Sequence, residues 1–255
     1  MRRTAVTIVI AVFWLTMMGL LVHREVLPSL AGGGAPTYQN ILENLNGPTE
    51  ETMGVYQGTR RVGSAAIRSR RREKGGFELA SDLRIDEPVS LLGQPSKVML
   101  KMSVNLNEQK DLESIELLMD AIIRLHLVGK VDRNAIVFRS VDGLMLPPLA
   151  LPWSGQELFQ HSLLPLARVG NLRVGKKWRV RLMGGLASDI GTAVIEVKAF
   201  EPVALPGKAV QAFRLEQRLG DQGPTYRAWV APDGMLLMQE LPLGLTLVRE
   251  ETKSD

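Results

Sequence analysis

The stretch that decides the fold is TYRAWVAPDGMLLMQELPLGLTLVR, residues 225–249. Two short apolar runs, 225–231 and 235–240, flank Pro232-Asp233-Gly234, and a third run covers 244–249. Pro, Asp and Gly in this order favour a tight turn, because Pro presets its φ and Gly tolerates a positive one. Short apolar runs between such turns are typical of antiparallel strands. The stretch therefore predicts three strands joined by tight turns.

The same pattern continues towards the N-terminus as far as Met53. Val, Ile and Leu dominate short runs, and turn residues such as Gly75-Gly76, Asp142-Gly143 and Pro206-Gly207 separate them. Further strands are predicted at about 53–57, 61–69, 76–84, 97–106, 112–119, 122–129, 134–140, 177–183, 191–201 and 207–218. This spacing indicates a large antiparallel, mainly β domain.

Residues 111–125 fit two interpretations. Leu112, Ile115, Leu118 and Met119 fit a period of 3.6 and allow a helix. The surrounding series of short strands favours two strands here instead, and we prefer that interpretation.

Two segments predict short helices that pack on the sheet. Residues 38–46 place Ile41, Leu42 and Leu45 on one face before Gly47-Pro48. Residues 154–169 begin with Ser154, a candidate N-cap with Glu157 at capping-box spacing, and Pro165 would kink the helix. Its mostly apolar stripe is Leu158, Phe159, Ser162, Leu163 and Leu166. We expect this helix to cover the concave face of a curved sheet.

The N-terminus carries a run of 19 uncharged residues, Thr4 to Val22. A helix of this length spans about 30 Å of hydrocarbon and satisfies its own backbone hydrogen bonds. Arg2 and Arg3 precede the run, so the positive-inside rule places residues 1–3 in the cytoplasm and the remainder outside. The membrane-anchor residues of this prediction include Thr4, Val6, Ile8, Ile10, Phe13, Trp14, Leu20 and Val22.

A cleaved signal peptide is the main alternative to this anchor. Signal peptides have a shorter apolar core and a small-residue cleavage site directly after it. Here His23, Arg24 and Glu25 follow the run, which favours a retained anchor. A buried core helix is the third interpretation. We expect a single-pass protein of the bacterial inner membrane with a flexible tether at 23–37, a periplasmic β-rich domain at 38–251 and a tail at 252–255.

The charge balance argues against nucleic acid as a partner. The chain has 31 Lys and Arg against 27 Asp and Glu, and Arg2 and Arg3 belong to the cytoplasmic stub. The net charge of the remainder of the chain is therefore only +2, which is too small to indicate binding of a polyanion. One basic cluster consists of Arg68, Arg70, Arg71, Arg72 and Lys74. A solvated hairpin tip is the simplest interpretation, and contact with anionic lipid or an acidic partner is the alternative.

Two ends of the predicted domain resemble a known exported module. MGVYQGTRRVGSAAIRSRR (53–71) resembles the opening hairpin, with its Gly-Val-Tyr-x-Gly pattern, of an exported bacterial β-domain of unknown function found with transglutaminase-like proteins. YRAWVAPDGMLLMQELPLGLTLVREE (226–251) resembles the closing hairpin of that module, and LLPLARVGNLRVGKKWRV (163–180) its middle. Such modules are similar to the LolA/LolB-like incomplete barrels, which implies a curved or incompletely closed sheet.

The chain departs from this family pattern in two ways. Ser64 replaces the Tyr that normally follows the Gly of the first hairpin. The chain has no Cys, so the Cys nucleophile of a transglutaminase-like domain is missing, as are disulfides and N-terminal lipidation.

No pattern in the sequence indicates catalysis, a cofactor or a metal. The three His residues, His23, His126 and His161, stand without catalytic or metal-binding spacing, and no HExxH, CxxC or phosphate-binding Gly-rich loop is present. The acidic pairs Glu113/Glu116 and Glu250/Glu251 are interpreted as solvated faces. The loop from Gly184 to Asp189 is interpreted as a connector, with the mouth of a cavity as the alternative.

The aliphatic surplus is the remaining feature. Its flexible members include Met99, Met102, Met119, Met145, Met183, Met235 and Met238. They fit an aliphatic core or, alternatively, a groove for an acyl chain. We therefore expect no enzyme but a non-catalytic envelope accessory module, whose partner is an exported protease-like protein or a transporter. The alternative is a membrane-tethered binder or carrier of a lipid or other hydrophobic ligand.

Overall fold

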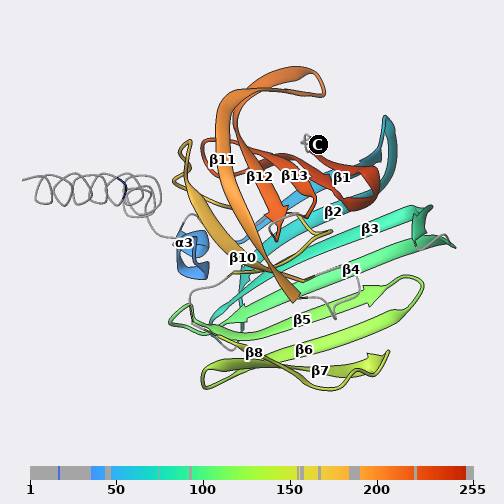
Figure 1. The fold of residues 1–255 in the computed structure, drawn as a ribbon, viewed down its shortest axis with the longest axis vertical. Coiled ribbons are helices and arrows are strands. Elements are labelled where there is room, and N and C mark those ends of the chain that lie inside the picture. Colours follow the sequence, from blue (N-terminus) through green and yellow to red (C-terminus); the bar gives the residue numbers. More distant parts are fainter. Residues whose placement is uncertain are drawn as a thin grey trace, which may run out of the picture.

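One large curved sheet makes up most of the described chain (Figure 1). The computed structural model describes residues 17, 36–43, 47–73, 75–91, 94–153, 155, 158–165, 168–183, 190–220 and 223–250. The sheet contains 15 strands in the order β8-β7-β6-β5-β4-β3-β2-β1-β15-β14-β13-β12-β11-β10-β9. Neighbours are antiparallel except β9 and β10, which are parallel. The strands β8 and β9 form its two open edges, so the barrel is not closed.

The strand bounds follow the chain in two series. The first comprises β1 (Thr49–Gln57), β2 (Arg60–Arg71), β3 (Phe77–Leu91), β4 (Gln94–Leu106), β5 (Leu112–Asp120), β6 (Arg124–Asp132), β7 (Ala135–Gly143) and β8 (Leu149–Pro152). The second comprises β9 (Phe159–His161), β10 (Lys177–Met183), β11 (Ile190–Leu205), β12 (Lys208–Leu219), β13 (Thr225–Val230), β14 (Leu236–Leu241), the 3₁₀ turn η2 (Pro242–Gly244) and β15 (Leu245–Arg249). Pairing of β1 with β15 joins the two series.

Alternating burial along the strands places the core inside the curve. In β5, for example, Ile115 and Leu117 are fully buried while Glu113 and Glu116 are exposed. Each such buried aliphatic side chain contributes about 1.5–3 kcal/mol. The short helix α3 (Tyr38–Glu43) adds Tyr38, Ile41 and Leu42 to the same core.

A second, small apolar cluster lies apart from this core. It consists of Val203, Ala212, Ala231 and Leu237, with Leu205, Val210, Trp229, Met235 and Met238 packed around it. In Figure 1 the long β11–β12 hairpin curls over the rest of the fold. Residues near its tip therefore pack against side chains of β13 and β14.

Most of the strand predictions are confirmed. Residues 111–125 form β5, a turn at 121–123 and the start of β6, so the helix alternative is wrong. The predicted helix at 38–46 is present as α3 over 38–43. Several strands are longer than predicted. β3 runs on to Leu91 and β11 to Leu205.

The prediction of a helix at 154–169 is wrong. The described residues there include the strand β9, whose Phe159, Gln160 and His161 pair with Arg181, Leu182 and Met183. The backbone N–H of Arg181 also donates to the carbonyl of Leu158 at 2.8 Å. The helical spacing of apolar residues was misleading because tertiary pairing with β10 overrides local propensity. The expectation that this segment covers the inside of the sheet was nevertheless close, since Phe159, Leu163 and Leu164 are buried in the main core.

The predicted membrane anchor lies outside the described residues. Of residues 1–35, only Met17 is described, so Arg2, Arg3 and the run from Thr4 to Val22 stay predictions. The tether at 23–35 and the tail at 252–255 lie outside as well. Within the described ranges, no helix combines the length and apolarity that crossing a bilayer requires.

Candidate functional site

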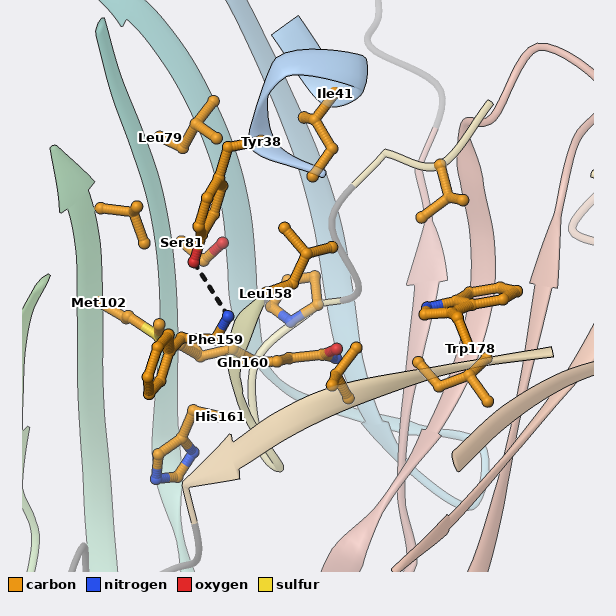
Figure 2. Close-up of a pocket in the computed structure, with 16 residues that line it drawn as sticks. Tyr38, Ile41, Leu79, Ser81, Met102, Leu158, Phe159, Gln160, His161 and Trp178 are labelled. Atoms are coloured by element: carbon orange, nitrogen blue, oxygen red, sulfur yellow. Dashed lines mark hydrogen bonds between the residues drawn. The ribbon is translucent and has the colours of Figure 1, made fainter. Parts of the chain in front are cut away.

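A cavity lies inside the curve of the sheet, next to β9 (Figure 2). About 60 Å³ of its space is open to the centre of a water molecule. Side chains from α3, β3, β4, β9, β10 and β11 line it, together with the loop after β9. They include Tyr38, Leu79, Ser81, Met102, Phe159, Gln160, His161 and Trp178. The cavity is therefore mostly apolar, with a few polar groups.

Tyr38 connects helix α3 to strand β9. Its hydroxyl accepts a hydrogen bond from the backbone N–H of Phe159 at 2.9 Å, the dashed line in Figure 2. Burial raises the pKa of the phenol well above its usual value of 10.0, although the hydrogen bond from Phe159 acts in the opposite direction. Tyr38 is therefore neutral at any physiological pH, and its proton is still available to a hydrogen-bond acceptor.

The two polar side chains of β9 are buried. His161 is 0% exposed, and its Nδ1 accepts a hydrogen bond from the N–H of Leu163 at 3.2 Å. A ring nitrogen that accepts cannot carry a proton, so the imidazole is neutral. Gln160 is 8% exposed, and its Nε2 has no hydrogen-bond partner among the described residues.

The predicted helix at 154–169 left Gln160 and His161 outside its apolar stripe, yet both side chains are buried. In the strand β9, Phe159 and His161 lie on one side and Gln160 on the other, and all three are buried (Figure 2). The local sequence carries no signal for this position, because burial of Gln160 follows from the pairing of β9 with β10.

The opening motif of the sequence forms part of a second hollow, a groove beneath the tip of the β11–β12 hairpin. The hydroxyl of Tyr56 donates to Oε1 of Glu250 at 3.0 Å, and Nε of Arg61 donates to the same oxygen at 2.7 Å. A Cβ at Gly54 would meet the Glu250 carboxylate and the Tyr56 ring, so a larger residue here would displace one of these side chains. The motif residues Gly54, Tyr56 and Arg61 therefore hold the last described residue, Glu250, against β1.

The charged and polar groups of this network shift one another's pKa values. The hydrogen bond from Arg61 holds the pKa of the Glu250 carboxyl below its usual value of 4.5, outweighing its partial burial. Burial and the bond to Glu250 raise the pKa of Tyr56. Glu250 is thus no freely solvated carboxylate, which corrects the prediction for that residue. Glu251 lies outside the described residues.

The groove next to this network has a volume of about 650 Å³. Its apolar wall comes from the second cluster. The lining residues are Tyr56, Leu205, Pro206, Lys208, Val210, Ala231, Met235, Leu237, Arg249 and Glu250. Arg249 forms an ion pair with Glu51 at 2.9 Å, and Glu250 pairs with Arg61. The groove is therefore apolar along its length and polar at one side.

The basic cluster at the end of β2 is paired with acids. Arg68 contacts Glu50 at 2.8 Å and Asp82 at 2.6 Å, and Arg70 contacts Glu78 at 2.6 Å. Arg72 pairs with Glu113, and Arg71 lies 6.0 Å from the ring centroid of Phe77. The side chains of Arg68 and Arg70 stay exposed (47% and 70%), as expected for a solvated hairpin tip, and the strands β1, β3 and β5 bring carboxylates to these arginines. Lys74 lies outside the described residues.

His126 lies on β6 between two carboxylates. Its Nε2 is 2.7 Å from Glu116, and its Nδ1 is 3.4 Å from Asp142. The carboxylates flank the ring on opposite nitrogens, so they do not converge on one point. Among the residues that the structure describes, no cluster of His, Asp and Glu could hold a metal ion. His23 lies outside the described residues, as does the predicted connector at 184–189.

Exposed apolar side chains occur on neighbouring segments near one edge of the sheet. Nine large hydrophobic residues are exposed in the described part of the chain, and five of them belong to the turn between β5 and β6, to β7 and to the segment that follows it. We call these five the distal patch: Ile122 (37% exposed), Val141 (56%), Leu144 (43%), Met145 (69%) and Leu149 (37%).

Hydrogen bonds hold the segments of the distal patch together. The N–H of Leu144 donates to the carbonyl of Arg124 at 2.7 Å, and the N–H of Leu146 donates to Oγ of Ser140 at 2.9 Å. Leu149 pairs with Phe138. In Figure 1 helix α3 lies at the left end of the sheet and the β5–β6 turn at the opposite end. The patch is thus far from the point where the chain enters the domain.

Two solved structures of proteins of unknown function show a distant likeness to the chain. No family model matches the chain, and no curated protein matches it. A β-barrel-like protein of the domain of unknown function DUF1849 from Brucella abortus covers 80% of this chain and 98% of its own, with 10% identity and a TM-score of 0.46. A DUF1089 family protein from Pseudomonas aeruginosa covers 70% and 89%, with 13% identity and a TM-score of 0.37. Both are similar in overall shape only.

Proposed function

We propose that the chain is a membrane-anchored, non-catalytic interaction module of the bacterial envelope. The observation that carries this proposal is the distal patch. Large apolar side chains cost free energy in water, and on a folded domain a gathered set of them marks an interaction site. The anchor predicted at 4–22 would hold the α3 end near the membrane. The patch would then face away from it, towards a partner.

An exported protein is the partner proposed for this surface. The resemblance of 53–71 and 226–251 to modules found with transglutaminase-like proteins suggests a protease-like enzyme or a transporter of the same membrane. The curved sheet would supply a rigid support, since β5, β6 and β7 are paired along nearly their whole length. A rigid support lowers the entropy lost on binding.

Site-specific photo-crosslinking in intact cells tests this proposal. A photoreactive p-benzoyl-phenylalanine in place of Met145 should give one discrete adduct, identified by mass spectrometry. Adding Leu144→Asp should abolish it without changing thermal stability, because that side chain is already exposed. The same photoreactive residue in place of Val174, which is 55% exposed elsewhere, is the control. Equal labelling from both positions, or no adduct from Met145, would refute the interaction site.

A hydrophobic-ligand binder is the second candidate, and the groove under the β11–β12 hairpin favours it. Its volume of about 650 Å³ lies within the range of about 300–1,000 Å³ typical of ligand pockets. The interior cavity, at about 60 Å³, is too small for a lipid. A lipid chain would therefore lie along Leu205, Val210 and Leu237 in the groove.

Native mass spectrometry of the full chain tests the second candidate. A co-purifying amphiphile should be present in the natural chain and lost from a Val210→Trp variant, whose indole would fill the groove. Leu243→Trp places the same side chain at a position 45% exposed outside the groove and should keep the amphiphile. Retention of the amphiphile by Val210→Trp, or its absence from the natural chain, would rule the groove out.

A further inference from the structure

The interior cavity has the size of a small ligand. One water-sized group needs about 10–15 Å³ of space for its centre. The 60 Å³ of the cavity therefore holds about four to six such groups. This excludes lipids and peptides, but it admits a short aliphatic compound or a few waters.

One polar group of the cavity, the Gln160 amide, has N–H donors without an acceptor among the described residues. Gln160 is more than nine-tenths buried, and both hydrogens of its Nε2 are without a partner among the described residues. Tyr38 already accepts from Phe159 and retains its own proton. Figure 2 shows the Gln160 side chain extending from β9 between Phe159 and Trp178. A buried amide donor without an acceptor costs about 1–3 kcal/mol, so the cavity favours an occupant that presents an acceptor.

The occupant must also be uncharged. Among the described residues that line the cavity there is no Lys, Arg, Asp or Glu. His161 is neutral because its Nδ1 accepts a hydrogen bond. An anion would therefore lose its hydration without gaining a counter-ion, which is strongly unfavourable in an apolar site. A carboxylate or phosphate does not fit, whereas a neutral carbonyl does.

We propose that this cavity binds a small neutral carbonyl compound with a short aliphatic chain. Its carbonyl oxygen accepts a hydrogen bond from Nε2 of Gln160, and its chain packs among Leu79, Met102 and Trp178. This site is separate from the distal patch and from the groove, so the proposal stands independently of the proposed function.

The test compares two probes of equal shape on the unchanged full chain in lipid nanodiscs. The probes are 2-pentanone and 2-methyl-1-pentene, in which a CH₂ group replaces the carbonyl oxygen. Ligand-detected saturation-transfer NMR gives their affinities, and empty nanodiscs correct for partitioning into lipid. The ketone should bind more tightly by about 5- to 150-fold, the range expected when a buried donor gains or lacks its acceptor.

Two variants then assign the effect to Gln160. Gln160→Leu should weaken the binding of 2-pentanone by the same factor. The affinity for the alkene should stay unchanged or increase. Gln211→Leu, the same exchange at an exposed position of β12, should change neither. Equal affinity of the two probes for the unchanged chain would overturn the proposal, whether or not Gln160→Leu folds. Saturation no greater than in empty nanodiscs would overturn it too, and would leave ordered water as the occupant.

Discussion

Truncation of Phe159 measures how strongly strand β9 is held inside the sheet. Phe159 is 6% exposed. Its ring centroid lies 5.4 Å from that of Trp153 and 6.1 Å from that of Phe138, and its N–H donates to Tyr38. Phe159→Ala removes both ring contacts and enlarges the existing cavity, which Phe159 lines.

The size of the effect follows from this burial. Truncation of a buried Phe to Ala costs about 3–5 kcal/mol. In a domain of this size, each kcal/mol lowers the melting temperature by about 2–4 °C. We therefore expect a decrease of about 6–20 °C, measured by far-ultraviolet circular dichroism on the full chain in nanodiscs.

Phe200→Ala is the matched control. Phe200 also contacts another ring, that of Phe213, at 4.7 Å, but it is 49% exposed. Its truncation should cost about 0.5–1.5 kcal/mol, the value of an aromatic pair, and lower the melting temperature by only a few degrees. If the two variants melt at the same temperature, β9 does not lie in the interior of the sheet. The cavity lined by β9 would then not exist as described.

Two further predictions concern the opening motif. Gly63→Ala should destabilise the domain by about 1–3 kcal/mol, because the added Cβ meets the backbone carbonyl of Arg84. Gly191→Ala is the control, since its Cβ meets only a Leu219 methyl group at 3.3 Å. Equal melting temperatures of the two variants would refute the close approach of β2 and β3. The free energy of unfolding of the natural chain should fall on acidification, because Arg61 lowers the pKa of Glu250 in the folded state. The stabilisation from ionised Glu250 is complete above a pH of about 4.5, its usual pKa. It is lost as the pH falls through the lowered pKa. Glu250→Gln should be less stable at neutral pH and show a shallower acid dependence in urea titrations, and an unchanged acid dependence would contradict this assignment.

The sequence by itself determined the strands and turns of most of the domain. Alternation of apolar and polar residues in 97–106 and 112–119 reports which side chains face the core, and this information is local. The turn Pro232-Asp233-Gly234 is local as well, since it depends on the φ values that these residues prefer. Even the ambiguous segment 111–125 was assigned correctly from the series of short strands around it.

Only the tertiary structure decided which residues that are distant in sequence contact one another. Tyr56 and Glu250 are 194 residues apart in sequence, and the pairing of β1 with β15 brings them together. The burial of Gln160 likewise depends on a parallel partner, β10, that no local pattern identifies. A short segment with an apolar stripe can satisfy its backbone as helix or strand, and the partner that the sheet offers decides between them. The candidate site could not be predicted for the same reason: it consists of side chains whose proximity results from the curvature and pairing of the whole sheet.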